Sequence, residues 1–430
     1  MLFYTAVLIL TSSLILDLCV RCYTLGRLPS NKLHRIHSNI GSEPKMTYNL
    51  GGGQILMSCF RNKQGLLIRT YAARIKNPKA SIILVHGVRS HFRADYSAYN
   101  LDWHCKHIGD SVTSKALEVS TMEFNHVFAN SRLNSNETFD NQFLHGKNVL
   151  DTTPRFQYEG SFIECLNNMG FSIYALDLQS HGLSEGFSGK RCLVNKFDDF
   201  AHDVIQFIDI VKRNQFENKE EKWNPDLFTH DTVNDGNKYY LGGLSMGGNI
   251  VIRTIQLFNK YSKSKTRLVD GLLCLSGMLN IDYHFSGYLK QASFPLIRFL
   301  AKIRPHWTLI LEEAGQYAET ISLFMRYHDP LYHSKRLPCK MVVTLFDATK
   351  TLERDMLYYP KDLPTLVIHS TDDKTCDVKG ARDFANVHFK DNDNVQLVEI
   401  DGEAHVISSP LYTPIVSPII SKWFDGLSKA

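Results

Sequence analysis

Three residue types at separate places in the chain could together perform nucleophilic catalysis. Ser245 lies in the run Gly243-Leu244-Ser245-Met246-Gly247, whose small residues allow a sharp turn that projects the hydroxyl group. A serine hydroxyl is a weak nucleophile at neutral pH, so it needs a base to take its proton and a carboxylate to orient that base. His405 is the candidate base, and Asp372 and Asp373 are the candidate carboxylates.

Each candidate follows a segment that the apolar pattern predicts to be a buried strand. The predicted strands are 81–85, the run from Tyr239 into the Ser245 turn, 171–176, 269–276, 365–370 and 395–400. Helical spacing of apolar residues predicts helices at 160–169, 197–211, directly after Ser245, 378–387 and 414–427. Alternating strands and helices indicate a mainly parallel sheet with helices on both faces. With the chain order Ser, acid, His, this pattern predicts an α/β-hydrolase fold.

The same arrangement requires two backbone N–H groups to stabilise the negative charge of a tetrahedral intermediate. One comes from the residue after the nucleophile, which is Met246. The other comes from the loop after the strand 81–85, where we assign Val88 as the donor. His86 and Gly87 belong to this loop and are candidate substrate-binding residues, although His86 also suits a purely structural role in the turn.

The remaining chain divides by composition around this core. We expect the following parts: a signal peptide or signal anchor at 1–22, a linker at 23–56, the first part of the core at 57–277, a lid at 278–360 and the second part of the core at 361–430. Two polar stretches, at about 88–155 and 214–237, are expected to be insertions. Residues 278–360 are assigned to a helical lid because they interrupt the alternation and are rich in apolar residues at helical spacing.

Composition limits the possible partners. The 430 residues are 43% hydrophobic, which is ample for a packed core, and the net charge of +4 is too small to indicate nucleic-acid binding. Nine cysteines lack the spacing of a disulfide scaffold. The cluster at 104–107 (His-Cys-Lys-His) has no second ligand group at a recognised spacing, so we expect no metal and no cofactor. The oligomeric state is left open.

The N-terminus favours the secretory pathway or a membrane. Leu2 to Leu16 is mostly apolar, short for a membrane span but as long as a signal-peptide core. Cys19 and Cys22 could carry acyl chains beside a membrane. The alternative is a buried or amphipathic helix at the start of a cytoplasmic protein.

Six segments match a known family in their order and spacing. They are HGVRSH at 86–91, DLQSHGLS at 177–184, GLSMGG at 243–248, DPL at 329–331, DKTCD at 373–377 and GEAH at 402–405. Together they resemble the monoglyceride lipase and lysophospholipase family of α/β hydrolases, of the serine aminopeptidase or hydrolase-4 type. Ser180 stands where this family usually has glycine. The long insertion and the Asn-rich loops are similar to lysophospholipase-like proteins of protozoan parasites.

The resemblance implies that Asp373, rather than Asp372, is the acid. It also implies a substrate class, the carboxyl esters of single-chain lipids such as monoacylglycerols or lysophospholipids, and a membrane surface as partner. A lid of this kind could line an acyl tunnel, and the candidate lining residues are Phe285, Phe294, Leu296, Phe299 and Leu300. Ordinary packing within the lid explains any one of them equally well.

Two other functions fit the same residues. An acyltransferase would use the same triad and pass the acyl chain to an alcohol instead of water. A non-catalytic lipid-binding protein could keep the fold, but the complete set of candidate catalytic residues favours an enzyme.

Overall fold

The computed structural model describes residues 47–50, 53–99, 156–229, 236–263, 266–308, 329, 331–333 and 336–428. The N-terminal segment expected to be a signal peptide or anchor lies outside these residues. So do most of the insertion predicted from residue 88, the His-Cys-Lys-His cluster at 104–107 and part of the predicted lid.

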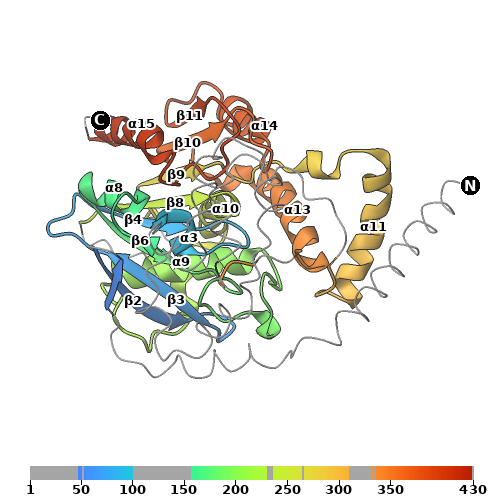
Figure 1. Ribbon diagram of the computed structural model, residues 1–430, viewed down its shortest axis with the longest axis horizontal. Coiled ribbons are helices and arrows are strands. Elements are labelled where there is room, and N and C mark those ends of the chain that lie inside the picture. Colours follow the sequence, from blue (N-terminus) through green and yellow to red (C-terminus); the bar gives the residue numbers. More distant parts are fainter. Residues whose placement is uncertain are drawn as a thin grey trace, which may run out of the picture.

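A nine-stranded sheet forms the centre of the described chain (Figure 1). Its spatial order is β1 (Thr47–Leu50), β2 (Gly53–Arg61), β3 (Leu67–Ala73), β7 (Phe171–Leu176), β4 (Ala80–Val85), β8 (Tyr239–Leu244), β9 (Gly271–Leu275), β10 (Thr365–Ser370) and β11 (Val395–Ile400). Neighbours from β7 to β11 are parallel, whereas β1, β2, β3 and β7 pair antiparallel. The prediction of a mainly parallel sheet is therefore confirmed.

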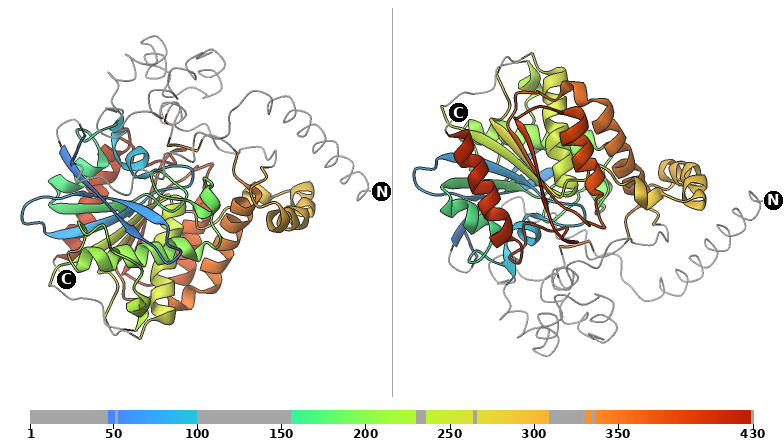
Figure 2. Two further views of the ribbon diagram at one scale, coloured as in Figure 1. Left: turned by 90° about the horizontal axis from the view of Figure 1, so that it is seen from below. Right: turned by 90° about the horizontal axis from the view of Figure 1, so that it is seen from above.

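The central strands are apolar on both faces because helices cover both sides (Figure 2). On β4, Ile83 and Val85 join one core cluster, and the alternate residues Ile82 and Leu84 join the other. The first cluster packs against α9 (Asp198–Lys212), α10 (Met246–Tyr261), α13 (Cys339–Arg354) and α14 (Val378–Arg382). The second packs against α3 (Phe92–Tyr96), α8 (Phe162–Asn168) and α15 (Thr413–Leu427).

The sheet begins earlier in the chain than the sequence pattern predicts. Part of the predicted linker forms β1, which pairs with β2 from Thr47 opposite Leu56 to Leu50 opposite Gly53. The linker prediction is thus wrong from residue 47 onward, because backbone pairing on an edge hairpin needs no strong apolar pattern.

The predicted polar insertion also starts too early. Residues 92–96 form α3, and all five of its side chains are buried. Phe92 and Tyr96 are part of the core, and the polar Arg93 and Asp95 are buried beside them. Polar composition is a poor guide here, because the charged side chains are buried with the apolar ones.

The predicted lid contains two helices with different surroundings. Met341, Leu345 and Leu352 of α13 belong to the core cluster that packs on α10, so this helix is part of the core. The helix α11 (Tyr288–Ile303) packs on α13 and projects from the sheet (Figures 1 and 2).

The five residues proposed to line an acyl tunnel do not form a common lining. Phe294 packs on Phe346 of α13 with ring centroids 4.6 Å apart, and Leu300 is buried. Leu296 and Phe299 are exposed to solvent. The side chain of Phe285 lies outside the described residues.

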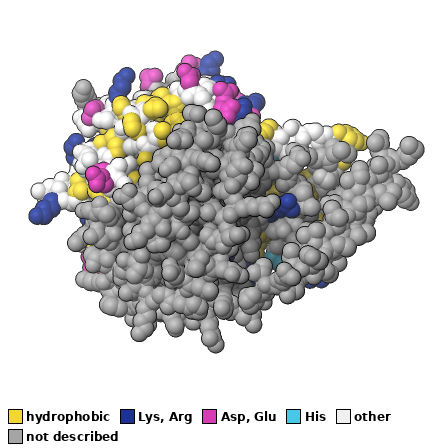
Figure 3. Space-filling model, viewed as in Figure 1, with side chains coloured by type: hydrophobic (Ala, Val, Ile, Leu, Met, Phe, Trp, Pro, Cys, Tyr) yellow, Lys and Arg dark blue, Asp and Glu magenta, His cyan; other side chains and the backbone are white. Residues whose placement is uncertain are grey.

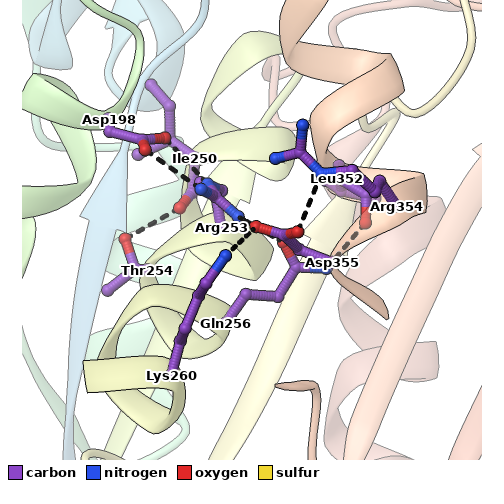
Figure 4. A network of polar contacts seen from close by, with 9 residues as sticks. All are labelled: Asp198, Ile250, Arg253, Thr254, Gln256, Lys260, Leu352, Arg354 and Asp355. Atoms are coloured by element: carbon purple, nitrogen blue, oxygen red, sulfur yellow. Dashed lines mark hydrogen bonds and ion pairs between the residues drawn. The ribbon is translucent and has the colours of Figure 1, made fainter. Parts of the chain in front are cut away.

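A buried ionic network holds the helices of one face together (Figure 4). Arg253 of α10 contacts Asp198 of α9 at 2.8 Å and Asp355, directly after α13, at 2.7 Å. Lys260 and Arg354 also contact Asp355, at 3.1 Å and 3.0 Å. Because Arg253 and Asp355 are each only 3% exposed, this network fixes α13 against α10 in a way that solvent screens weakly.

Apolar side chains are exposed at two distant places on the described surface. One group lies on α11 and includes Phe299 and Ile303; the other lies at the start of α15 and includes Leu411 and Ile415. Hydrophobic side chains are visible at the upper left of the molecule, where α15 lies in Figure 1 (Figure 3). In the part of the chain that the structure describes, no helix is long and apolar enough to span a membrane.

Candidate active site

Ser245 sits on a strained turn between β8 and α10. Its backbone angles are φ 56° and ψ −121°, a left-handed conformation that costs a non-glycine residue energy. The turn leaves no room for side chains on either flank. A Cβ at Gly243 would lie 2.3 Å from the Gly247 carbonyl oxygen, and one at Gly247 would lie 2.1 Å from that of Val85. The two glycines of the motif are therefore required by the close backbone approach.

Backbone hydrogen bonds hold Ser245 in this conformation. Its N–H donates to the Leu275 carbonyl at 2.9 Å, and its own carbonyl accepts the N–H of Gly248 at 2.9 Å and that of Met278 at 2.8 Å. The serine is thus fixed to both β9 and α10. Its residue exposure is 6%, which makes it nearly buried under the loops that surround it.

The acid and the histidine come from the loops after β10 and β11. These strands pair in parallel with Ser370 opposite Ile400, so both loops start side by side. Asp373 Oδ2 accepts a hydrogen bond from His405 Nδ1 at 2.8 Å. Asp372 is exposed and accepts a weak 3.3 Å bond from Thr371, so Asp373 is the carboxylate placed against the histidine.

Asp373 is held as a carboxylate. Its Oδ1 accepts the backbone N–H of Thr375 at 2.7 Å and that of Cys376 at 3.1 Å. Burial alone would raise the pKa of Asp373, but His405 and the hydrogen bonds from the two nearby histidines outweigh burial and hold this pKa below its usual value. An ionised acid at this place fixes the ring of His405 and leaves the other nitrogen, Nε2, for proton transfer.

The acid loop also reaches the serine. The thiol of Cys376, three residues after Asp373, is buried and interacts with the side chain of Ser245. Burial raises the pKa of this thiol well above its ordinary value, so it stays protonated beside the serine. Ser245, Asp373 and His405 therefore occupy one site.

The turn after β4 lies against the nucleophile. Val85 of β4 pairs with Gly243 of β8, which brings the two following loops together. A Cβ built on Gly87 would lie 3.2 Å from Ser245 Cβ, a tight contact, and 3.5 Å from Oγ, so Gly87 lies directly against the nucleophile. In the part of the chain that the structure describes, neither Val88 nor Met246 donates its N–H to a backbone oxygen. Both N–H groups are suited to binding an oxyanion.

His86 has a structural role in this turn. Its Nδ1 donates to the Gly87 carbonyl at 2.7 Å, and its Nε2 accepts the N–H of Leu178 at 2.9 Å. Burial lowers the pKa of His86, so the ring stays neutral. Because both nitrogens bind backbone and the residue is fully buried, the predicted substrate-binding role does not agree with its position.

A buried carboxylate that the sequence analysis missed shapes the same turn. Asp95 of α3 accepts the Gly87 N–H at 2.7 Å on one oxygen and the Ser90 hydroxyl at 2.6 Å on the other. The Gly87 N–H is therefore occupied and is not an oxyanion donor. No local pattern marks Asp95, since it lies in a segment whose composition resembles an insertion.

Two of the six segments that resemble the hydrolase family are in contact in the structure. His91, which ends the first segment, contacts Asp329 of the DPL segment through Nε2 and Oδ2 at 2.6 Å. Both are buried, and His333 donates its N–H to the Arg89 carbonyl at 2.8 Å. These contacts tie the turn after β4 to the chain that returns from the predicted lid.

The segment at 177–184 supports the turn from the other side. Asp177 is buried and accepts the Phe92 N–H at 3.0 Å, the Leu183 N–H at 2.8 Å and the Tyr71 hydroxyl at 2.7 Å. Ser180, where glycine is usual in the family, has φ 67°. The backbone thus keeps the left-handed conformation that explains the glycine, and the Ser180 hydroxyl bonds to the Leu193 carbonyl.

The beginning of the predicted lid rests on the acid loop. Tyr283 donates its hydroxyl to the Lys374 carbonyl, and His284 Nε2 lies 3.0 Å from the Thr375 carbonyl. The Asp377 N–H donates to the Asn280 carbonyl at 3.2 Å. The acid loop is therefore braced on both sides. Among the described residues, no group of three or more His, Cys, Asp or Glu side chains is arranged to hold a metal ion.

This geometry can perform acyl transfer through a serine. It combines a nucleophile on a strained turn, a histidine oriented by an ionised buried carboxylate, and the backbone N–H groups of Val88 and Met246, which have no backbone acceptor among the described residues.

Comparison with known proteins agrees with this chemistry. The family described as serine aminopeptidase, S33 (Hydrolase_4) matches residues 145–408, which is more than half of the chain. Monoglyceride lipase of Mus musculus is 24% identical over 253 residues, covering 57% of this chain and 70% of that protein.

Two solved structures share the fold. A structure titled "Lipase (Open form)" has a TM-score of 0.52 at 15% identity and covers 87% of this chain and 100% of its own. A carboxyl esterase from Bacillus coagulans in complex with glycerol has a TM-score of 0.51 at 13% identity, covering 86% and 98%.

The chain belongs to the serine aminopeptidase S33 family of α/β hydrolases. It is a serine hydrolase of the esterase type, distantly similar to monoglyceride lipases. The predicted α/β-hydrolase fold is confirmed. The predicted likeness to protozoan-parasite proteins has no support in these comparisons and stays a prediction.

Proposed function

We propose that the chain hydrolyses the carboxyl ester of a single-chain lipid, either a monoacylglycerol or a lysophospholipid, through an acyl-enzyme on Ser245. The observation that carries this proposal is the hydrogen bond from His405 to the buried carboxylate of Asp373, with Ser245 held beside the same loop.

The proposed reaction has two halves. In the first half, His405 Nε2 takes the proton of Ser245 while Oγ attacks the ester carbon, and the carbonyl oxygen becomes an oxyanion bound by the N–H groups of Val88 and Met246. The carbon–oxygen bond to the alcohol then breaks, and His405 returns the proton to the leaving alcohol. In the second half, water attacks the acyl-enzyme with His405 as base and releases the fatty acid. Asp373 stays ionised throughout and orients His405.

Two facts support a single-chain lipid as substrate. The mammalian relatives found by comparison are named monoglyceride lipase, and the segments around Ser245 and His405 are those that resemble this family. In addition, α11 projects from the core with exposed apolar side chains and carries Lys290, Arg298 and Lys302 without any acidic residue.

The proposed partner surface is a lipid bilayer with anionic head groups, contacted by α11. An exposed helix with apolar and basic side chains favours binding in the interfacial region of such a membrane. Arg298 forms an ion pair with Asp347, with Nη1 2.8 Å from Oδ2, so the exposed Lys302 is the basic side chain proposed to contact head groups. The segment Leu2 to Leu16 is proposed to contribute to membrane association.

The test is hydrolysis of a panel of monoacylglycerols and lysophospholipids with several acyl lengths, using Ser245→Ala as the blank. We expect release of free fatty acid that depends on Ser245 and is faster for single-chain lipids than for diacyl lipids. If the protein cleaves only short soluble esters, the assignment of a lipid substrate is wrong. If the acyl group is found on an added alcohol, the protein is an acyltransferase and not a hydrolase.

A further inference from the structure

A second histidine lies behind the proposed catalytic acid. His369, at the end of β10, is fully buried. Its Nε2 lies 2.9 Å from the Cys376 carbonyl oxygen and 3.3 Å from Asp373 Oδ2. The same Oδ2 accepts the hydrogen bond from His405 Nδ1 at 2.8 Å. One carboxylate oxygen is thus shared by two imidazole rings, while the other accepts the backbone N–H groups of Thr375 and Cys376.

The neighbours of His369 determine its tautomer. The two atoms near Nε2 are a carbonyl oxygen and a carboxylate oxygen, and both are acceptors. Nε2 therefore carries a proton and divides its hydrogen bond between them, with the shorter contact to Cys376. In the described chain, Nδ1 of His369 has no hydrogen-bond partner. The two acceptors near Nε2 therefore determine the orientation of the ring.

This arrangement differs from that of a histidine that only fills the core. Both ring nitrogens of His86 bind backbone groups, the Gly87 carbonyl and the Leu178 N–H. His369 leaves one nitrogen without a partner and directs the other at the oxygen that orients His405. An unpartnered Nδ1 also occurs at His91 and His202, so the feature that distinguishes His369 is the contact of its Nε2 with the catalytic carboxylate.

We propose that His369 is a positioning residue for the reaction, whose Nε2–H fixes Asp373 Oδ2 and the Cys376 carbonyl so that the carboxylate is aimed at His405. This inference rests on the proposed function of the triad. The contact to Cys376 anchors the loop, and the contact to Oδ2 sets how strongly that oxygen attracts the proton on His405. Without the second donor, Oδ2 would serve His405 alone and would favour its protonated form more strongly.

Other titratable groups surround His369 and must be considered in any pH experiment. They belong to the strands, loops and helices packed around it and are Cys274, Tyr283, Asp373, Cys376, Asp377, Arg382, Glu399 and His405. Arg382 pairs with Glu399 through two hydrogen bonds, which holds the pKa of Glu399 below its usual value. Burial keeps the two thiols protonated, because it raises the pKa of each.

The test compares three variants of the full chain. His369→Gln places an amide nitrogen near the position of Nε2 and keeps a donor for Asp373, whereas His369→Asn places it near Nδ1 and His369→Leu removes it. We expect the Gln variant to keep the kcat of the wild type. The Asn and Leu variants should lose about tenfold in kcat, as for one charge-assisted hydrogen bond, with little change in KM. Their acidic limb of kcat/KM against pH should move up by about half a unit.

The result that overturns the proposal is equal behaviour of the Gln and Asn variants, whether both are active or both inactive, with equal thermal unfolding. Should the variants not fold, histidine 15N NMR of the wild type decides instead. It should show a neutral Nε2–H tautomer for His369, and a proton on Nδ1 contradicts the assignment. Wild-type hydrolysis that disappears in Ser245→Ala tests the proposed function separately, so failure of one is not failure of the other.

Discussion

Ser245 is presented by a backbone conformation that only its surroundings can stabilise. Backbone hydrogen bonds offset the energetic cost of the left-handed φ of 56°. The glycines on either side allow the neighbouring backbone to come within contact distance. The hydroxyl is consequently held in one place before substrate arrives. A fixed nucleophile avoids the entropic cost of positioning it during the reaction.

Replacing Gly87 by alanine tests the space around this hydroxyl. The new Cβ would lie 3.2 Å from Ser245 Cβ and 3.5 Å from Oγ, so it would crowd the path of the attacking oxygen. We expect kcat/KM for an ester to fall by about tenfold, which corresponds to about 1.4 kcal/mol of transition-state stabilisation. The free energy of unfolding should fall by about 1 kcal/mol.

Gly426→Ala is the matched control for this measurement. Nothing lies within 4 Å of a Cβ at Gly426, which belongs to α15, so the activity should remain that of the wild type. Equal activity of Gly87→Ala and the wild type in a steady-state assay would show that the turn after β4 is not close to the reacting atoms.

The residues of the site differ in whether a short stretch of sequence is enough to identify them. Ser245, Asp373 and His405 could be named from the sequence because short motifs and preceding strands mark each of them. Asp95 and His369 could not be named, because no motif specifies the fold of the turn that Asp95 supports or the ring orientation of His369. The sequence leaves a substrate-binding role for His86 open, because a His-Gly turn does not reveal that both ring nitrogens bind backbone.

At the scale of elements, the ionic network around Arg253 should stabilise the packing of α9, α10 and α13. Arg253→Met leaves Asp355 buried with only Lys260 and Arg354 as partners. Breaking a buried ion pair by removing one partner costs about 3 kcal/mol, and we expect a loss of this order in the free energy of unfolding in urea. Lys422→Met, an exposed change of equal charge on α15, should change it by less than about 0.5 kcal/mol.

The same network predicts a pH dependence. Burial alone would raise the pKa of Asp355, but hydrogen bonds from Arg354, Arg253 and Lys260 outweigh it, and the pKa lies below its usual value. A carboxyl group whose pKa is lower in the folded state stabilises the fold above its unfolded pKa, and this stability is lost as the pH falls. The stability difference between wild type and Arg253→Met should therefore shrink below about pH 4. A difference that stays constant down to pH 3 would mean that Asp355 is not the partner that matters.

Membrane docking is a prediction about α11. The double variant Phe299→Glu, Ile303→Glu should bind less to vesicles of anionic phospholipid in a sedimentation assay, because two exposed apolar side chains become charged. Leu411→Glu, Ile415→Glu at the start of α15 is the control, since its residues are similarly exposed, at 54% and 51% against 57% and 55%. Hydrolysis of a soluble ester should be unaffected in both. Equal binding of the two double variants would place the docking surface elsewhere.

Elements with strong apolar patterns were predictable, and those that rely on pairing or tertiary packing were not. The central strands and α9, α10 and α15 lie within about two residues of their predicted bounds. The strand β1 and the helix α3 were not predicted, because edge pairing and buried charge leave little trace in composition. The helix α13 was assigned to a lid because its apolar face has the same spacing whether it covers a substrate or a core.

For the whole molecule, sheet order explains why the site forms where it does. From β4 the chain continues to β7 on one side, and β8 lies on the other. Loops on the two sides therefore diverge at the carboxyl ends of β4 and β8, which is where ligands bind in open parallel sheets. The turn at Gly87 and the serine at 245 occupy this place, and the loops after β10 and β11 bring the acid and the histidine to the same edge.

The central claim is that Ser245 is an activated nucleophile, and a fluorophosphonate probe tests it most directly. Such a probe reacts covalently with a serine that a neighbouring histidine activates. The full-length wild type should be labelled at a single peptide containing Ser245, as located by mass spectrometry, and Ser245→Ala should not be labelled. A folded wild type that never reacts, or a Ser245→Ala variant that is labelled to the same extent, would contradict the account.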